Sequence, residues 1–176
     1  ALFMGALRAG VVVAPLAPSA TADSLASMLR DAGARRLFTD AAARERLPGA
    51  EHLPPCTALD DDATFDRWLA PASTRPTPAT IAPEAPFNII YSSGTTGTPK
   101  GIVQSHGMRW AHIQRGSVYD YGPQGSTLLA TPLYSNTTLV VFVPTLAYGG
   151  CVVLSPKFDA LHYLQLAQRH RVTHTM

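Results

Sequence analysis

The sequence is short of cysteine, of net charge and of long apolar runs. Its two cysteines, Cys56 and Cys151, stand alone without metal-ligand spacing, which favours free thiols in a reducing cytosol over a disulfide-stabilised secreted fold. A formal charge of +2 with scattered arginines argues against a nucleic-acid partner. Proline cuts short the apolar runs at 11–14 and 139–143, which argues against a membrane span. We therefore expect a cytoplasmic protein.

The histidines form no ligand pattern. His170 and His174 are four residues apart, but Val172 and Thr173 between them predict a strand, which removes the helical spacing that two metal ligands would need. No metal site held by protein side chains is predicted.

Strand-like and helix-like segments alternate along the chain. Apolar patterns predict strands at 11–16, 36–40, 87–91, 126–133, 151–154 and from 172. They predict helices at 1–10, 21–33, 41–47, 105–113, 136–148 and 159–167. The predicted N-caps are Ser19 or Thr21 for the second helix, Ser105 for the fourth and Asp159 for the last. With 46% hydrophobic residues in a chain of 176, this order predicts an α/β fold of three layers, a mostly parallel sheet with helices on both faces.

Five prolines punctuate residues 71–86, with threonine, alanine and serine between them. Such a composition predicts an extended surface connector. Because the segment before it is short for a separate core, we expect the connector to lie within one domain over residues 1–176.

The segment Tyr91–Gly101 has the composition of a phosphate-binding loop. Its glycines permit positive φ and let peptide N–H groups approach phosphate oxygens closely. Serine and threonine hydroxyls add neutral donors, and Lys100 adds a point charge. A buried strand at 87–91 and a helix from Ser105 predict a strand-to-helix context for the loop.

A Walker A loop is excluded, because Pro99 precedes Lys100 and Gly101 follows it. The run instead resembles the signature of the adenylate-forming enzymes, which include acyl-CoA synthetases, coumarate-CoA ligases, luciferases and peptide-synthetase adenylation domains. The resemblance implies that the loop wraps the β- and γ-phosphates of ATP. It assigns contacts with ATP to Ser92, Ser93, Gly94, Thr95, Thr96, Gly97, Thr98 and Lys100, with Lys100 and Thr96 as the catalytic residues.

The alternative of a flexible Gly/Thr-rich turn is disfavoured by the Pro-Lys-Gly ending and by the strand that precedes it. Three further segments, at 5–18, 131–136 and 149–174, resemble family segments in the family's order. The resemblance places Tyr134, Ser135 and Asn136 at the acid or the adenylate. Ser135 stands where many acyl- and aryl-CoA ligases have a histidine. The alternative left open is that Tyr134 belongs to the core and Asn136 caps a helix.

The family's aromatic-Gly-x-Thr-Glu strand, ribose-binding aspartate and late lysine have no counterpart in this sequence. We expect the remainder of the same polypeptide to supply them, and the isolated chain to be inactive. The resemblance implies an acid-thiol ligase that uses ATP and Mg²⁺ to adenylate a carboxylic acid and then forms a thioester with coenzyme A. A carrier-protein thiol stays open, as do a nucleotide-binding module without chemistry and an inactive fragment.

Overall fold

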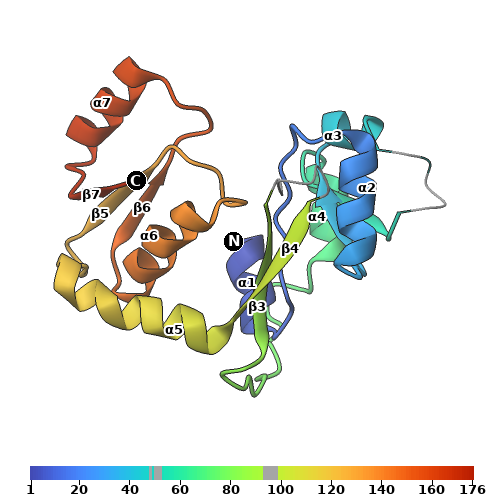
Figure 1. The fold of residues 1–176 in the computed structure, drawn as a ribbon, viewed down its shortest axis with the longest axis horizontal. Coiled ribbons are helices and arrows are strands. Elements are labelled where there is room, and N and C mark those ends of the chain that lie inside the picture. The colour runs from blue at the N-terminus through green and yellow to red at the C-terminus, as the bar shows by residue number, and fades with distance from the viewer. Residues whose placement is uncertain (48, 50–52, 93–98) are drawn as a thin grey trace.

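The computed structural model describes residues 1–47, 49, 53–92 and 99–176, which form an α/β fold. Within these ranges the strands make three small sheets. Strands β1 and β2 pair in parallel, β3 and β4 are antiparallel, and β6, β5 and β7 form a parallel sheet in that order. Figure 1 shows the β3–β4 pair between helices α2 to α4 on one side and α6 and α7 on the other.

The first part of the described chain alternates helices with short strands. Its elements are α1 (Leu2–Arg8), α2 (Ala22–Asp31), β1 (Leu37–Thr39), α3 (Ala41–Glu45), β2 (Cys56–Ala58) and α4 (Asp62–Trp68). Of the two caps that the sequence allows for α2, the structure uses Thr21, whose hydroxyl accepts the N–H of Ser24 at 3.2 Å. The sequence prediction missed β2 and α4, which long-range packing supports: the Trp68 ring meets Phe38 edge-on at 4.7 Å.

The strand predicted at 11–16 is wrong. This segment makes only a single parallel bridge, between Val13 and Asn88 of β3. Pro15 and Pro18 follow it closely, and proline has no N–H with which to continue a ladder.

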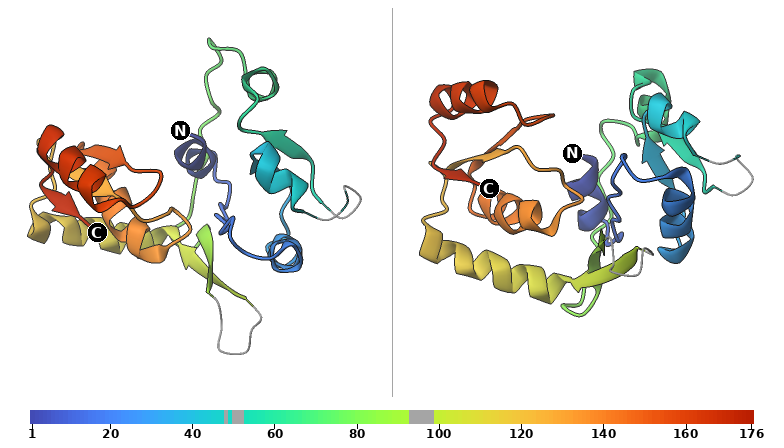
Figure 2. Two further views of the ribbon diagram at one scale, coloured as in Figure 1. Left: turned by 90° about the horizontal axis from the view of Figure 1, so that it is seen from above. Right: turned by 45° about the horizontal axis from the view of Figure 1, so that its top comes forward.

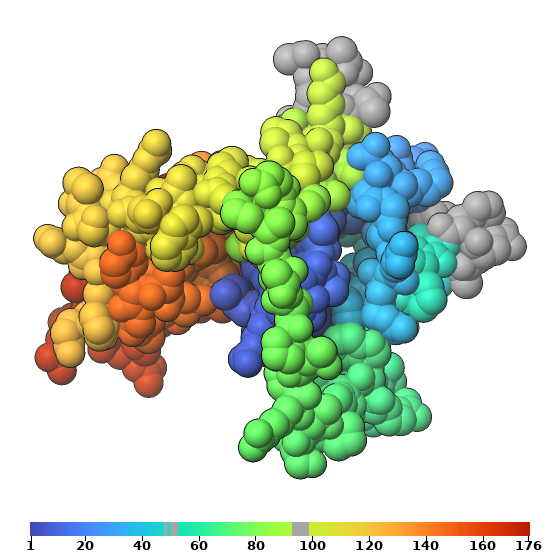
Figure 3. Space-filling model, turned by 90° about the horizontal axis from the view of Figure 1, so that it is seen from below, coloured from blue at the N-terminus to red at the C-terminus, as the bar shows by residue number. Residues whose placement is uncertain are grey.

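Residues 71–85 contain neither helix nor strand, in agreement with their proline content. In Figure 3 this segment, in green, runs across the blue N-terminal helix. Gly10, at the end of that helix, has φ of +73°. A Cβ at this position would lie 3.7 Å from the side chains of Ala79 and Ile81, so the connector packs closely on the turn after α1.

The second part of the chain carries the candidate site. Its elements are β3 (Pro86–Ser92), β4 (Lys100–Ser105), α5 (His106–Arg115), a 3₁₀ turn (Gly116–Tyr119), β5 (Ser126–Leu129), α6 (Asn136–Ala147), β6 (Cys151–Leu154), α7 (Ala160–Arg169) and β7 (His174–Thr175). The predicted caps of α5 and α7 are confirmed, since Ser105 Oγ accepts the N–H of Met108 and Asp159 Oδ1 accepts that of His162. The right panel of Figure 2 shows α5 running from the end of β4 beneath α6.

The predicted strand-to-helix context of the phosphate loop is wrong. Strand β4 intervenes, so the loop segment is flanked by two antiparallel strands, whereas α5 starts at His106, in agreement with the helix predicted from Ser105. The β-branched residues Ile102 and Val103 favour a strand here, and they pair with Ile90 and Ile89 of β3.

Strand β3 packs in the main core against α1, from the first part of the chain, and α6, from the second part. Phe87 and Ile90 of β3 belong to one buried cluster with Leu7 of α1 and Leu139 and Phe142 of α6. The Phe3 ring, also on α1, lies edge-on to Phe87 and Phe142. No helix in the described ranges has the length and apolar character needed to cross a membrane.

Candidate nucleotide and acid site

The hairpin β3–β4 brings Ser92 and Lys100 together at the end that carries the loop. The two residues are direct partners in the antiparallel register, and both side chains are exposed. Directly paired residues of antiparallel strands point to the same face of a sheet. The predicted phosphate contacts Ser93, Gly94, Thr95, Thr96, Gly97 and Thr98 lie outside the described residues.

Gly101 is required for space. It pairs with Tyr91 across the hairpin, and a Cβ there would lie 3.1 Å from Ile89 Cγ2, 3.1 Å from Tyr91 Cε1 and 3.2 Å from Asp31 Oδ2. These are tighter than ordinary contacts, so the glycine lets the stem of the loop close against α2. The sequence analysis expected the glycines to allow close approach to phosphate oxygens. At Gly101 the close approach is instead to other residues of the protein.

The Tyr91 hydroxyl ties the hairpin to α2. It lies 2.7 Å from Asp31 Oδ2 and 3.0 Å from the carbonyl oxygen of Met28. Burial raises the pKa of Tyr91 most, and its hydrogen bond to Asp31 and the charge of that carboxylate raise it further. The tyrosine therefore remains a neutral donor that fixes the strand one residue before Ser92.

The predicted acid segment forms the start of α6. Ser135 occupies the N-cap position, and its hydroxyl lies 2.6 Å from that of Thr137. Tyr134 is half-buried. The alternative in which Asn136 caps the helix is wrong: Asn136 is the first helical residue, and its side-chain oxygen accepts from Gln104 Nε2 at 3.0 Å.

Sequence reasoning missed Arg109, which joins the acid segment to the hairpin. The helix at 105–113 was predicted from its apolar residues, but Arg109 is 1% exposed while the apolar Trp110 is 58% exposed. Arg109 Nη2 donates to Asn136 Oδ1 at 2.9 Å and Asn88 Oδ1 at 3.2 Å, and also bonds Gln104 Oε1. The available signal was Asn88, an amide inside the buried strand 87–91.

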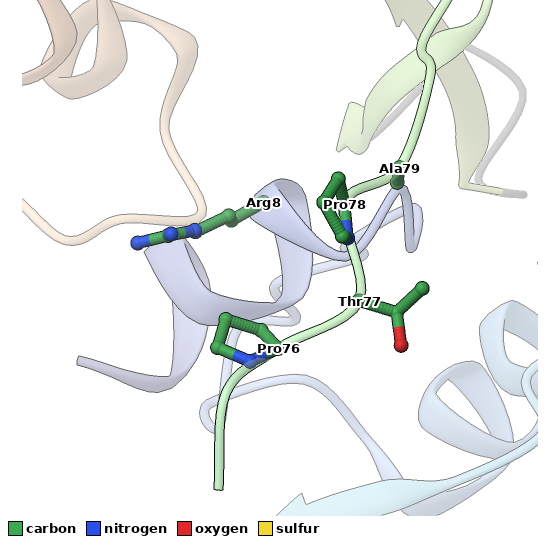
Figure 4. Close-up of a pocket in the computed structure, with 5 residues that line it drawn as sticks. All are labelled: Arg8, Pro76, Thr77, Pro78 and Ala79. Atoms are coloured by element: carbon green, nitrogen blue, oxygen red, sulfur yellow. The ribbon is translucent and has the colours of Figure 1, made fainter.

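A surface hollow elsewhere brings none of the candidate site residues together. It is lined by Arg8 of α1 and by residues 76–79 of the connector (Figure 4). The candidate site therefore consists of the hairpin end with Ser92 and Lys100 and of the start of α6, which contacts the hairpin through Gln104.

Fold and site together define an α/β protein that carries a Gly- and Thr-rich loop on a hairpin, beside the start of a buried helix. The family model of AMP-binding enzymes matches residues 1–176, and the chain belongs to this family. The predicted resemblance to adenylate-forming enzymes is thereby confirmed.

Relatives of different activity match nearly all of this chain. The nonribosomal peptide synthetase gloA of Glarea lozoyensis is 31% identical over 97% of the chain and 2% of its own length. The sulfoacetate–CoA ligase of Cupriavidus necator is 31% identical over 98% of the chain and 35% of its own length. Among solved structures, the o-succinylbenzoate CoA synthetase (MenE) of Bacillus subtilis with AMP has a TM-score of 0.83 at 25% identity, covering 98% of this chain and 44% of that one. The chain thus spans less than half the length of each of these proteins.

Proposed function

We propose that residues 1–176 bind the phosphates of ATP for an enzyme that activates a carboxylic acid by adenylation. The observation that carries the proposal is the direct pairing of Ser92 with Lys100 at the end of the hairpin. The residues between them read Ser-Gly-Thr-Thr-Gly-Thr-Pro, and the first six supply hydroxyls and backbone N–H groups suited to phosphate oxygens. Membership of the AMP-binding family supports the same function.

The exposed hairpin end suits a polyphosphate. Ser92 and Lys100 are exposed side by side on one face, offering a hydroxyl and an ammonium group. We assign the other phosphate contacts to Ser93, Gly94, Thr95, Thr96, Gly97 and Thr98. Mg²⁺, when bound with ATP, adds charge that screens the phosphates from the incoming carboxylate.

In the first reaction, a carboxylate oxygen attacks the α-phosphorus of ATP. The bond from that phosphorus to the oxygen bridging to the β-phosphate breaks, and pyrophosphate leaves with the electron pair. Lys100 and Thr96 stabilise the charge that develops on the leaving group, which is the kind of electrostatic assistance that dominates such transfers. Tyr134, Ser135 and Asn136 contact the acid in this assignment.

In the second reaction, we assign the attacking thiol to coenzyme A. Its sulfur attacks the acyl carbon, the bond between that carbon and the AMP oxygen breaks, and AMP leaves with the electron pair. The CoA ligase and CoA synthetase among the similar proteins support this acceptor. The peptide synthetase supports a carrier-protein thiol as the second candidate, which a direct competition of the two thiols for the preformed adenylate would decide.

We propose that residues 1–176 are part of an N-terminal AMP-binding domain, with 71–86 as a connector inside it. The resemblance to acyl- and aryl-CoA ligases favours fatty or aromatic acids as substrates and a cytoplasmic location.

The test is acid-dependent exchange of labelled pyrophosphate into ATP by the complete polypeptide, with a panel of aliphatic, aromatic and amino acids. Exchange that requires one class of acid is the expected result. ATP binding without exchange for any acid would assign a nucleotide-binding module, and absence of ATP binding would leave the family fold without its activity.

A further inference from the structure

Arg109 is a buried cation whose described partners are all uncharged. Its Nε and Nη2 atoms donate to the side-chain oxygens of Asn88, Gln104 and Asn136. The Phe87 ring lies 5.7 Å from the guanidinium carbon. Burial lowers the pKa of Arg109 to about 10, so the side chain still carries its charge at neutral pH.

Stability alone does not account for an arginine at this position. Removing a charge from water carries a desolvation cost that a leucine or methionine of similar volume avoids. Within the part of the chain that the structure describes, Arg109 Nη1 is buried without a hydrogen-bond partner, as is Asn88 Nδ2. A buried polar group kept at such a cost is a reason to look for a functional role.

The position of the cluster suggests that role. Asn88 lies on β3, four residues before Ser92, and Gln104 lies on β4, four residues after Lys100. Asn136 begins α6 and follows the other two residues of the predicted acid segment. Gln104 also donates to Asn136, so the cluster joins both strands of the loop stem to the start of α6.

The hairpin register carries this connection to Lys100. Asn88 pairs with Gln104, Ile90 with Ile102, and Ser92 with Lys100. Paired residues share a face, and every second pair along the hairpin lies on that same face. The Arg109 cluster and the Ser92–Lys100 pair therefore lie on one face of the stem, about 13 Å apart at 3.3 Å per residue.

We propose that Arg109 is a positioning residue that couples the ATP loop to the acid-binding segment, so that binding of one substrate favours binding of the other. Because the guanidinium is enclosed, it acts through Asn88, Gln104 and Asn136 and does not touch either substrate. The inference rests on the proposed function, since it needs ATP at the loop and an acid at 134–136.

The experiment uses the acid that supports pyrophosphate exchange. It measures the affinity of the complete polypeptide for this acid, with and without a non-hydrolysable ATP analogue. Arg109→Met preserves much of the side-chain volume and removes the hydrogen bonds. Arg115→Met changes an exposed arginine at the end of the same helix and is the matched control. In the wild type and in the control, we expect the analogue to tighten acid binding about tenfold, within the usual range for coupled sites.

In Arg109→Met, that enhancement is expected to fall below about twofold, under the roughly 5- to 150-fold that is typical of coupled sites. Gln104→Met, which cuts the link on the β4 side, should reduce it as well and serves if the first variant does not fold. Arg109→Lys keeps the charge without the planar donor fork, so it should fold without restoring the coupling.

Full coupling in a folded Arg109→Met protein would overturn the proposal, as would an active wild type without any coupling. Unfolding of both Arg109→Met and Gln104→Met would assign the cluster to stability alone and would also overturn the proposal. The proposed function fails separately, through absence of acid-dependent pyrophosphate exchange in the wild type.

Discussion

The hydroxyl of Tyr91 lies 2.7 Å from the carboxylate of Asp31, which links the strand before the phosphate loop to the last residue of α2. Helix α2 thereby supports the stem of the loop at a point where Gly101 leaves room for the contact. The two strands that flank the proposed phosphate loop are thus held by α2 through Tyr91 and by α5 and α6 through Arg109.

Loss of the Tyr91 hydroxyl should weaken this support. Tyr91→Phe removes a hydrogen bond to a charged acceptor, and we expect unfolding free energy to fall by about 1.5 to 3 kcal/mol. Urea unfolding measures the change, with Tyr119→Phe as control because that ring is exposed. Equal stability of the two variants would contradict a supporting role for the Asp31 contact.

A methyl group at Gly101 should force the hairpin away from α2. With contacts of 3.1 Å to Ile89 and Tyr91, Gly101→Ala is expected to destabilise the fold by about 1 to 3 kcal/mol, the usual cost of overpacking. Gly5→Ala provides the contrast, because nothing lies within 4 Å of a Cβ there and the residue is inside α1. That variant should gain about 0.5 to 1 kcal/mol. Urea unfolding of both variants should therefore show a loss of stability for Gly101→Ala and a gain for Gly5→Ala.

The charge of Lys100 should matter for adenylation and little for folding. In the complete polypeptide, Lys100→Ala is expected to slow acid-dependent pyrophosphate exchange by about 10²- to 10³-fold, as for loss of a group that stabilises developing charge. Lys157→Ala, which removes an exposed lysine after β6, is the control for the change of charge. Exchange that persists unchanged without Lys100, at unchanged melting temperature, would remove this residue from the mechanism.

His112 should make stability depend on pH. Burial lowers its pKa first, and the charges of Arg109 and Arg115 lower it further. Below the unfolded value of 6.5, the unfolded chain binds a proton that the folded chain does not. Unfolding free energy therefore falls as pH decreases from 6.5 to the lowered folded pKa, and this loss is complete below that pKa.

The His112→Gln variant tests this effect. Its unfolding free energy should change less between pH 7.5 and pH 5.5 than that of the parent, a pair of values chosen to bracket an ordinary histidine pKa of about 6.5. His162→Gln, which removes an exposed histidine on α7, should keep the parental dependence. An identical pH profile for all three proteins would contradict a lowered pKa of the half-buried His112.

What the sequence predicted depended on how local the interactions are. The caps at Thr21, Ser105 and Asp159 each bond an N–H three residues onward, so a short window of sequence contains both partners. Most helices and strands of the α/β fold followed from apolar periodicity for the same reason. Strand β2 depends on pairing with β1, which no local pattern reveals.

In the candidate site, too, local features were predicted from the sequence and long-range contacts were missed. The composition of residues 91–101 predicted a phosphate-binding loop, which stays a prediction, and its resemblance to a known signature led to the family that the family model shows. The hairpin that carries the loop was missed because no element was predicted between Gly101 and Ser105, where Ile102 and Val103 form only a short apolar run. Arg109 was missed because its partners come from β3, β4 and α6, and only the folded chain brings them together.

An antiparallel stem also constrains how such a loop can evolve. Because side chains alternate between faces, one residue inserted or deleted within β3 or β4 reverses the face of every residue between the change and the loop. Such a change would move Lys100 away from Ser92, whereas a change in pairs would preserve the face. Length variation in this family should therefore be rarer within the two strands than within the connector 71–85, which carries no register at all.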